Sequence, residues 1–139
     1  MAFEPVFGRN AEVSALLQGL IPGCDRGFDA FTSIGFGDPL VAGVIYHNWH
    51  PEAGVIELSA ASRHRGWLNR KNLGVIFQYP FVTLDCQMCV ARISEKNTRA
   101  RRIWSALGAT EYIIPRLRGE NEAEVIATLT REAWREFVR

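Results

Sequence analysis

The chain has 139 residues, 47% of them apolar, and its 16 basic and 15 acidic side chains leave a formal net charge of +1. This length predicts one domain over residues 1–139, and the apolar fraction is sufficient for a buried core. No run of about 18 apolar residues is present, which argues against a membrane-spanning helix. The N-terminus carries Glu4 and no long apolar stretch, unlike a secretory signal, so a cytoplasmic protein is expected.

The first half of the chain predicts one helix and three strands. Residues 10–20 place apolar side chains at helical spacing, with Asn10 as N-cap and Pro22 as a stop. Three apolar or alternating runs, separated by short turns, then indicate an antiparallel meander. These runs are 28–36, 40–49 and 54–62.

The second half predicts helices alternating with strands. A helix over 69–79 is expected to end or kink at Pro80, and a strand follows over 86–93. The run 97–108 is the clearest helix, with Asn97 as N-cap and Gly108 as C-cap. Two strands and a short closing helix complete the chain, at 110–117, 123–129 and 130–137.

This order of elements predicts an α/β (α+β) fold with a mixed, mostly antiparallel central sheet and helices on both faces. The strand–helix–strand unit over residues 54–93 has the length of a parallel crossover. Cys86 and Cys89 form a CxxC pattern within the expected strand. Positions three apart on a strand face opposite sides of the sheet, so neither a metal site nor a redox pair is expected.

Charge is unevenly spread along the chain. From Arg63 to Arg102 there are nine Lys or Arg residues and two acids, whereas the remainder holds seven cations and thirteen acids. This segregation predicts an anionic partner bound locally. A nucleic acid is not expected, because the aromatic residues do not alternate with the cations as a stacking platform requires.

The densest part of this basic region lies at a strand-to-helix junction, "ASRHRGWLNRKNLG". A helix N-terminus offers unpaired backbone N–H groups and the positive end of the helix dipole, so it favours anions. A glycine and four cations at that point predict a phosphate cradle; an ordinary solvated turn is the alternative. The five residues are Arg63, Arg65, Gly66, Arg70 and Lys71.

Two short motifs resemble those of the GNAT family, the Gcn5-related N-acyltransferases. "RHRGWL" is similar to the family's Q/R-x-x-G-x-G/A loop, with Leu68 in place of the second small residue. "NTRARRIWSALGAT" is similar to the helix that follows the family's fifth strand. The resemblance covers Leu40 to the C-terminus and is greatest to the ribosomal-protein N-terminal acetyltransferase branch. The first forty residues look abbreviated, and the family's first strand is not evident.

The resemblance implies that acetyl-CoA lies between two parallel strands that splay apart, 55–61 and 86–93. Backbone amides of residues 65–69 would hold the diphosphate. Trp67 is expected to be exposed beside adenine or the acceptor, and Asn97 to contact the pantetheine arm or simply cap its helix. The cofactor-binding residues expected on this basis are Arg63, Arg65, Gly66, Trp67, Leu68, Asn69, Asn97 and Arg102.

The implied reaction is direct attack of a primary amine on the thioester, without a covalent enzyme intermediate. Glu57 falls where family members often carry a general base. The family's frequent acid, a tyrosine, is replaced by Trp104, so Tyr112 is the expected acid, with Tyr79 and water as alternatives. A non-catalytic module that binds coenzyme A or a partner is the competing hypothesis.

The acceptor and the assembly are less defined by the sequence. The stretch Glu120, Glu122 and Glu124 is acidic, which would attract a cationic amine or a peptide N-terminus. A homodimer is expected, because an abbreviated N-terminal region leaves a sheet edge to cover.

Overall fold

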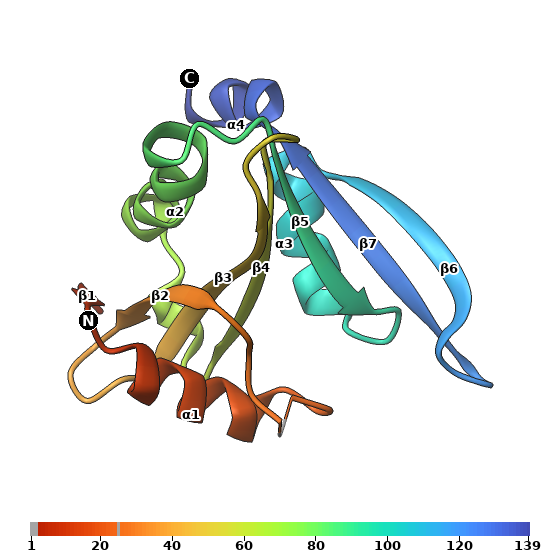
Figure 1. Cartoon of the computed structure of the whole chain (residues 1–139), viewed down its shortest axis with the longest axis horizontal. Helices are drawn as coiled ribbons and strands as arrows, with labels where there is room; N and C mark the ends of the chain where they lie inside the picture. Colours follow the sequence, from red (N-terminus) through yellow and green to blue (C-terminus); the bar gives the residue numbers. More distant parts are fainter. Residues whose placement is uncertain (1–2, 25) are drawn as a thin grey trace.

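The computed structural model describes residues 3–24 and 26–139 and contains one seven-stranded sheet with the strand order β1-β2-β3-β4-β5-β7-β6 (Figure 1). Four α-helices and two short helical turns, η1 and η2, flank it. The elements in chain order are β1 (Pro5–Phe7), α1 (Asn10–Leu20), β2 (Phe31–Phe36), β3 (Ala42–His50), β4 (Val55–Ser62), η1 (Arg65–Trp67), α2 (Arg70–Gln78), η2 (Tyr79–Thr83), β5 (Met88–Ser94), α3 (Thr98–Leu107), β6 (Thr110–Gly119), β7 (Glu122–Thr130) and α4 (Arg131–Val138).

The predicted architecture is confirmed. Strands β2, β3 and β4 form an antiparallel meander, and β4 pairs with β5 in parallel, as the crossover through α2 requires. Strand β7 lies antiparallel between β5 and β6. None of the helices in the described part of the chain is both long and apolar enough to cross a membrane.

Several local predictions were wrong. A first strand does exist, but β1 has only three residues and no readable periodicity, and it pairs with β2. Asn10 is the first residue of α1 rather than its N-cap, and its Oδ1 accepts a hydrogen bond from Ser33 Oγ at 2.6 Å. Strand β5 begins at Met88, so Cys86 precedes it.

The sheet has two differently covered faces. Helix α1 packs on one face of β2–β4, where Val13, Leu16 and Leu17 contact Ile45. Helices α2, α3 and α4 all pack on the opposite face. Their shared core includes Phe36, Tyr46, Leu58, Ile76, Phe77 and Trp134. Because α1 does not extend beyond β4, side chains of β5 and β7 that point to its face have no helix over them.

Candidate functional site

The parallel strands β4 and β5 separate soon after they begin. They pair only at Val55–Met88, Ile56–Cys89 and Glu57–Val90. Beyond Glu57, β4 remains paired with β3 and β5 with β7, so a gap opens between them (Figure 1). Since alternate residues of a strand hydrogen bond to each side, alternate amides and carbonyls of residues 58–62 are directed toward this gap. An extended ligand can pair with such a strand edge.

A cleft of about 1080 Å³ passes through the gap and is lined from both faces of the sheet. We call the part between α2 and α3 the apolar half. Its lining includes Leu58, Ile76, Phe77, Ala91, Ile93 and Trp104. We call the part on the face of α1 the polar half. Its lining includes His47, Glu57, Ser59, Arg92, Arg118 and Glu124.

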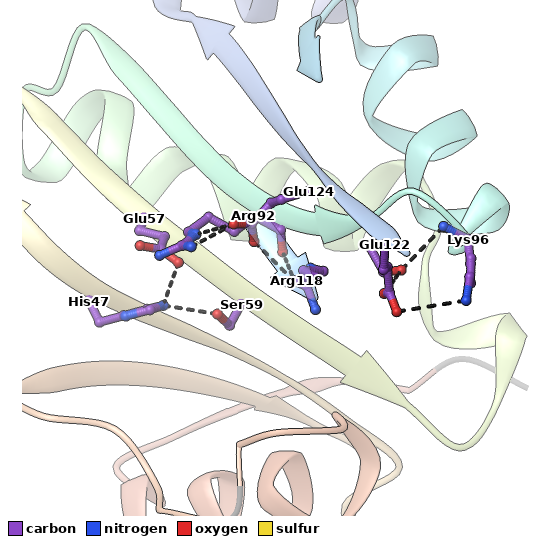
Figure 2. A network of polar contacts seen from close by, with 9 residues as sticks. His47, Glu57, Ser59, Arg92, Lys96, Arg118, Glu122 and Glu124 are labelled. Carbon is purple, nitrogen blue, oxygen red and sulfur yellow. Dashed lines mark hydrogen bonds and ion pairs between the residues drawn. The ribbon is translucent and has the colours of Figure 1, made fainter. Parts of the chain in front are cut away.

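Glu57 is the carboxylate at the point where the strands separate. Its Oε1 accepts a hydrogen bond from Asn48 Nδ2 at 2.9 Å, and its Oε2 lies 3.6 Å from His47 Nε2. The same His47 nitrogen is 2.9 Å from Ser59 Oγ (Figure 2). Burial lowers the pKa of His47, although the Glu57 carboxylate opposes that shift, so the neutral imidazole is favoured. With its side chain 16% exposed, Glu57 is held in place yet remains open to the cleft.

The neighbours of Glu57 were not predicted from the sequence. Glu57 and Ser59 are two residues apart on β4, and alternate residues of a strand lie on the same face of the sheet. This spacing could have predicted that the two side chains are neighbours. Asn48 adopts a left-handed backbone (φ 50°) where the register of β3 and β4 shifts between His47 and His50. That irregularity brings the Asn48 amide to the carboxylate, and nothing in the local sequence indicates it.

Two arginines share one buried carboxylate beside this group. Glu124 is 3% exposed, its Oε2 lies 2.5 Å from Arg92 Nη2, and its Oε1 lies 3.2 Å from Arg118 Nη2. Hydrogen bonding to Glu124 raises the pKa of Arg92. Glu124 is therefore buried and paired, and is not part of an open acidic surface. Glu122 is also engaged, with the Ser94 hydroxyl and with Lys96.

The turn after β4 is stabilised by its own hydrogen bonds. The Gly66 amide donates to His64 Nδ1 at 2.9 Å, so this amide has an acceptor within the turn. A Cβ on Gly66 would lie 3.0 Å from His64 Cε1, which explains why glycine suits this position. Asn69 Oδ1 caps α2 by accepting from the Asn72 amide at 2.9 Å. The other N–H groups of the first turn of α2 still face the N-terminal side of that helix.

The four cations of this junction fall into two classes. Arg70 lies 4.9 Å over the Phe137 ring, and Lys71 Nζ is 2.6 Å from Glu4 Oε2. Arg63 and Arg65 are exposed, and their guanidinium groups contact no polar group among residues 3–24 and 26–139. Among the described residues, the charges of Arg63 and Arg65 are therefore unpaired; neither side chain lines the cleft, but their chain neighbours Ser62 and Trp67 do.

Asn72 links this turn to the N-terminal segment by hydrogen bonds. It is 1% exposed, and its Nδ2 donates to the Trp67 carbonyl at 2.6 Å and to the Phe3 carbonyl at 2.9 Å. Because Asn72→Ala leaves both carbonyls without this donor, we expect a loss of about 2–4 kcal/mol in the free energy of unfolding, measured by urea denaturation. The control is Asn121→Ala in the exposed β6–β7 turn. A loss for Asn72→Ala no larger than that of the control would contradict this account.

Two of the predicted cofactor-binding side chains lie differently from the expectation. Trp67 is 5% exposed and packs on Phe36 with ring centroids 5.1 Å apart, so the prediction of an exposed indole was wrong. It lines the cleft from within the core, together with Leu68. Arg102 faces a separate hollow with Arg101 and Glu111, whereas Arg99 lines the cleft.

The third helix agrees better with its prediction. Asn97 caps α3 by accepting from the Ala100 amide at 3.1 Å, and it also lines the cleft. Gly108 ends the helix with φ 100°. Trp104 packs edge-on against Phe77 at 5.6 Å as part of the core.

Tyr112, the expected acid, is 56% exposed on β6 and is not among the cleft residues. In the described part of the chain, no tyrosine lines the cleft.

Cys86 and Cys89 are fully buried, and burial raises the pKa of both thiols. Within residues 3–24 and 26–139, no three His, Cys, Asp or Glu side chains are grouped to hold a metal ion.

Solved structures share this fold, although neither a protein-family model nor a curated protein matches the chain. A proposed acetyltransferase matches with TM-score 0.67 at 20% identity, over 88% of this chain and 66% of its own, so this chain spans just under two thirds of that protein. A GCN5-related N-acetyltransferase from Brucella melitensis matches with TM-score 0.62 at 15% identity, over 77% and 54%. A dodecameric spermidine N-acetyltransferase from Vibrio cholerae matches with TM-score 0.72 at 10% identity, over 95% of each chain.

At these identities the likeness establishes the fold. The chain has the fold of the GCN5-related N-acetyltransferases, as the two sequence motifs predicted.

Proposed function

We propose that the protein is an acetyl-CoA-dependent N-acetyltransferase that transfers an acetyl group directly to a primary amine. The observation that carries this proposal is the cleft itself. It joins an apolar half, beside the open edge of β4, to a polar half with a carboxylate at the point of separation. A thioester and an amine can thus approach each other from opposite faces of the sheet, which is what an orientation-based catalyst requires.

The residues around the apolar half fit an acetyl-CoA molecule. The edge of β4 beyond Glu57 supplies backbone donors and acceptors for an amide-containing arm. Leu68 and Asn97 line the path that such an arm would follow. The open charges of Arg63 and Arg65 and the first turn of α2 suit a diphosphate. When bound, acetyl-CoA supplies the activated acetyl group.

Glu57 is the group that we assign to proton removal. An amine must lose its proton before it can act as a nucleophile, and a positioned carboxylate accelerates such a step. Asn48 and His47 orient Glu57 by a hydrogen bond and a close polar contact. The uncharged imidazole that burial favours does not compete with the incoming ammonium for the carboxylate.

A non-catalytic module that binds coenzyme A or a partner is the alternative. The observation in its favour is that no tyrosine of the described chain lines the cleft, so the residue type that usually protonates the leaving thiolate in the resembled family is missing there. Release of free thiol from acetyl-CoA with a panel of primary amines separates the two functions. Amine-dependent release above hydrolysis is expected for the enzyme, and a binding module gives none.

The panel of primary amines should include peptides with free N-termini. The motifs resemble those of the ribosomal-protein N-terminal acetyltransferases, and that narrower likeness stays a prediction. A cytoplasmic location, which is where acetyl-CoA would be available, also stays a prediction.

We further propose a homodimer formed through β6. The edge that was expected to be open is covered in part by β1, which pairs with Ile34–Phe36 of β2, and β6 forms the other edge of the sheet. Its exposed apolar side chains are Tyr112, Ile113, Ile114 and Leu117, between 37% and 57% exposed. Such an edge strand favours pairing with a second strand.

The β6 dimer is tested by sedimentation equilibrium. The wild type is expected to be dimeric, and Ile113→Lys is expected to shift it to a monomer, because the lysine would be buried at the interface without a partner. The control is Val82→Lys, a similarly exposed position outside β6. A wild type that is monomeric throughout, or an Ile113→Lys variant that stays dimeric, would contradict a β6 interface.

A further inference from the structure

We propose that the acceptor is a zwitterion, an amine with a carboxylate a few atoms away, as in a free amino acid. The inference rests on the proposed acetyltransferase function and names its substrate class. It is carried by two oppositely charged groups in the polar half of the cleft. One is Glu57; the other is the set Arg92, Glu124 and Arg118, which we call the arginine pair.

The two groups lie on the same face of the sheet. Glu57 is opposite Val90 in the register of β4 and β5, and Arg92 is two residues further along β5. Side chains two apart on a strand share a face, so Arg92 points to the side of Glu57. Figure 2 shows the Arg92 side chain extending from Glu124 toward Glu57, with Arg118 on the far side of Glu124. An amine at Glu57 would therefore have the arginine pair next to it.

In the arginine pair, two guanidinium groups share one carboxylate. The set therefore has a net charge of +1. Arg92 donates to Glu124 Oε2 through Nε at 3.0 Å and Nη2 at 2.5 Å, and Arg118 Nη2 approaches Oε1 at 3.2 Å. Glu124 is 3% exposed, while the Arg92 and Arg118 side chains are 50% and 30% exposed. The buried carboxylate fixes the guanidinium groups, and the exposed remainder of each can receive a second carboxylate.

The hydrogen bond to Glu124 raises the pKa of Arg92, and Glu57 itself also acts electrostatically on Arg92 and helps to raise its pKa. The other charged side chains near these groups are Lys96, Glu122 and Asp29. Lys96 and Glu122 lie 3.8 Å apart as a pair and add no net charge. Asp29, exposed on the loop between α1 and β2, also lines the cleft and adds one negative charge. Arg99 lines the cleft from α3, which packs on the opposite face of the sheet, so it is not counted with the polar half. The polar half thus has a negative site at Glu57 and a positive site at the arginine pair.

This arrangement also discriminates against other amines. A polyamine would place a second ammonium group beside the arginine pair, and its positive charge would be repelled by the guanidinium groups. A carboxamide would leave the arginine pair without an anion. A zwitterion satisfies both charged sites at once.

The test compares L-amino acids with their carboxamides and with spermidine in the thiol-release assay. For the preferred amino acid, kcat/KM is expected to exceed that of its carboxamide about 10- to 100-fold. Arg118→Met should lower this ratio, because the pair of Arg92 and Glu124 that remains has no net charge. Arg118→Lys should restore part of the ratio. The control is Arg116→Met, which replaces an exposed arginine of the same strand that does not line the cleft. It should leave the ratio of amino acid to carboxamide kcat/KM unchanged.

The possible failures are distinguishable. Faster reaction of carboxamides or spermidine than of every amino acid would overturn the zwitterion proposal and leave the acetyltransferase function standing. Absence of thiol release with all amines would instead count against catalysis. In that case, calorimetric titration of the amino acids into the coenzyme A-loaded protein still decides the proposal. Binding that Arg118→Met weakens supports it, and no binding of any amino acid overturns it.

Discussion

Glu57→Gln is expected to lower kcat about 10²- to 10⁴-fold, the usual contribution of a positioned general base. Glutamine keeps the shape of the side chain and an oxygen for the Asn48 amide, which donates to Glu57 at 2.9 Å. The fold around the separation of β4 and β5 should therefore persist, while the group that accepts the proton of the amine is lost. Steady-state thiol release at saturating amine measures the effect.

The control for this substitution is Glu52→Gln, which removes an exposed carboxylate from the turn between β3 and β4. Equal binding of acetyl-CoA by the wild type and Glu57→Gln, checked by calorimetry, would show that the loss lies in the reaction step. If kcat of Glu57→Gln stays within about tenfold of the wild type, Glu57 is not the base and the polar half has been assigned wrongly.

Gly66→Glu is expected to raise the dissociation constant for acetyl-CoA about 10- to 100-fold relative to Gly66→Ala. A carboxylate at this turn repels a diphosphate and offsets the open charges of Arg63 and Arg65. The alanine variant is the matched comparison, since a Cβ at Gly66 already meets His64 Cε1 at 3.0 Å. Any displacement of His64 is then common to both variants, and the difference between them reports the charge.

Calorimetric titration of acetyl-CoA into both variants measures this difference, with thermal denaturation to establish that both are folded. Equal dissociation constants for Gly66→Ala and Gly66→Glu would place the diphosphate away from this turn. The effect should also shrink as salt is added, because the side chains of the turn are exposed and their interactions are screened.

The parts of the fold that the sequence predicted are those with long, regular patterns. Helix α3 has apolar spacing, an N-cap at Asn97 and a C-cap at Gly108, and all three features are present. The crossover from β4 through α2 to β5 follows from length and order alone. Strand β1, with three residues, contains too little pattern to detect, and only its pairing with β2 makes it a strand.

The candidate site was predicted less well because it depends on contacts between distant segments. Trp67 stands beside a glycine and two arginines, which suggests exposure, but Phe36 from a remote strand covers it. Glu124 lies in an acidic stretch at the start of the predicted strand 123–129, and nothing in the local sequence indicates that its carboxylate is buried. It is buried because β7 is an interior strand and because arginines of β5 and β6 meet it there.

The central claim is that the gap between β4 and β5 receives acetyl-CoA, and calorimetric titration of the wild-type protein with acetyl-CoA tests it most directly. We predict saturable binding with a dissociation constant below about 1 mM, in the range common for enzyme substrates. No heat of binding at millimolar acetyl-CoA, from protein shown to be folded, would contradict the account.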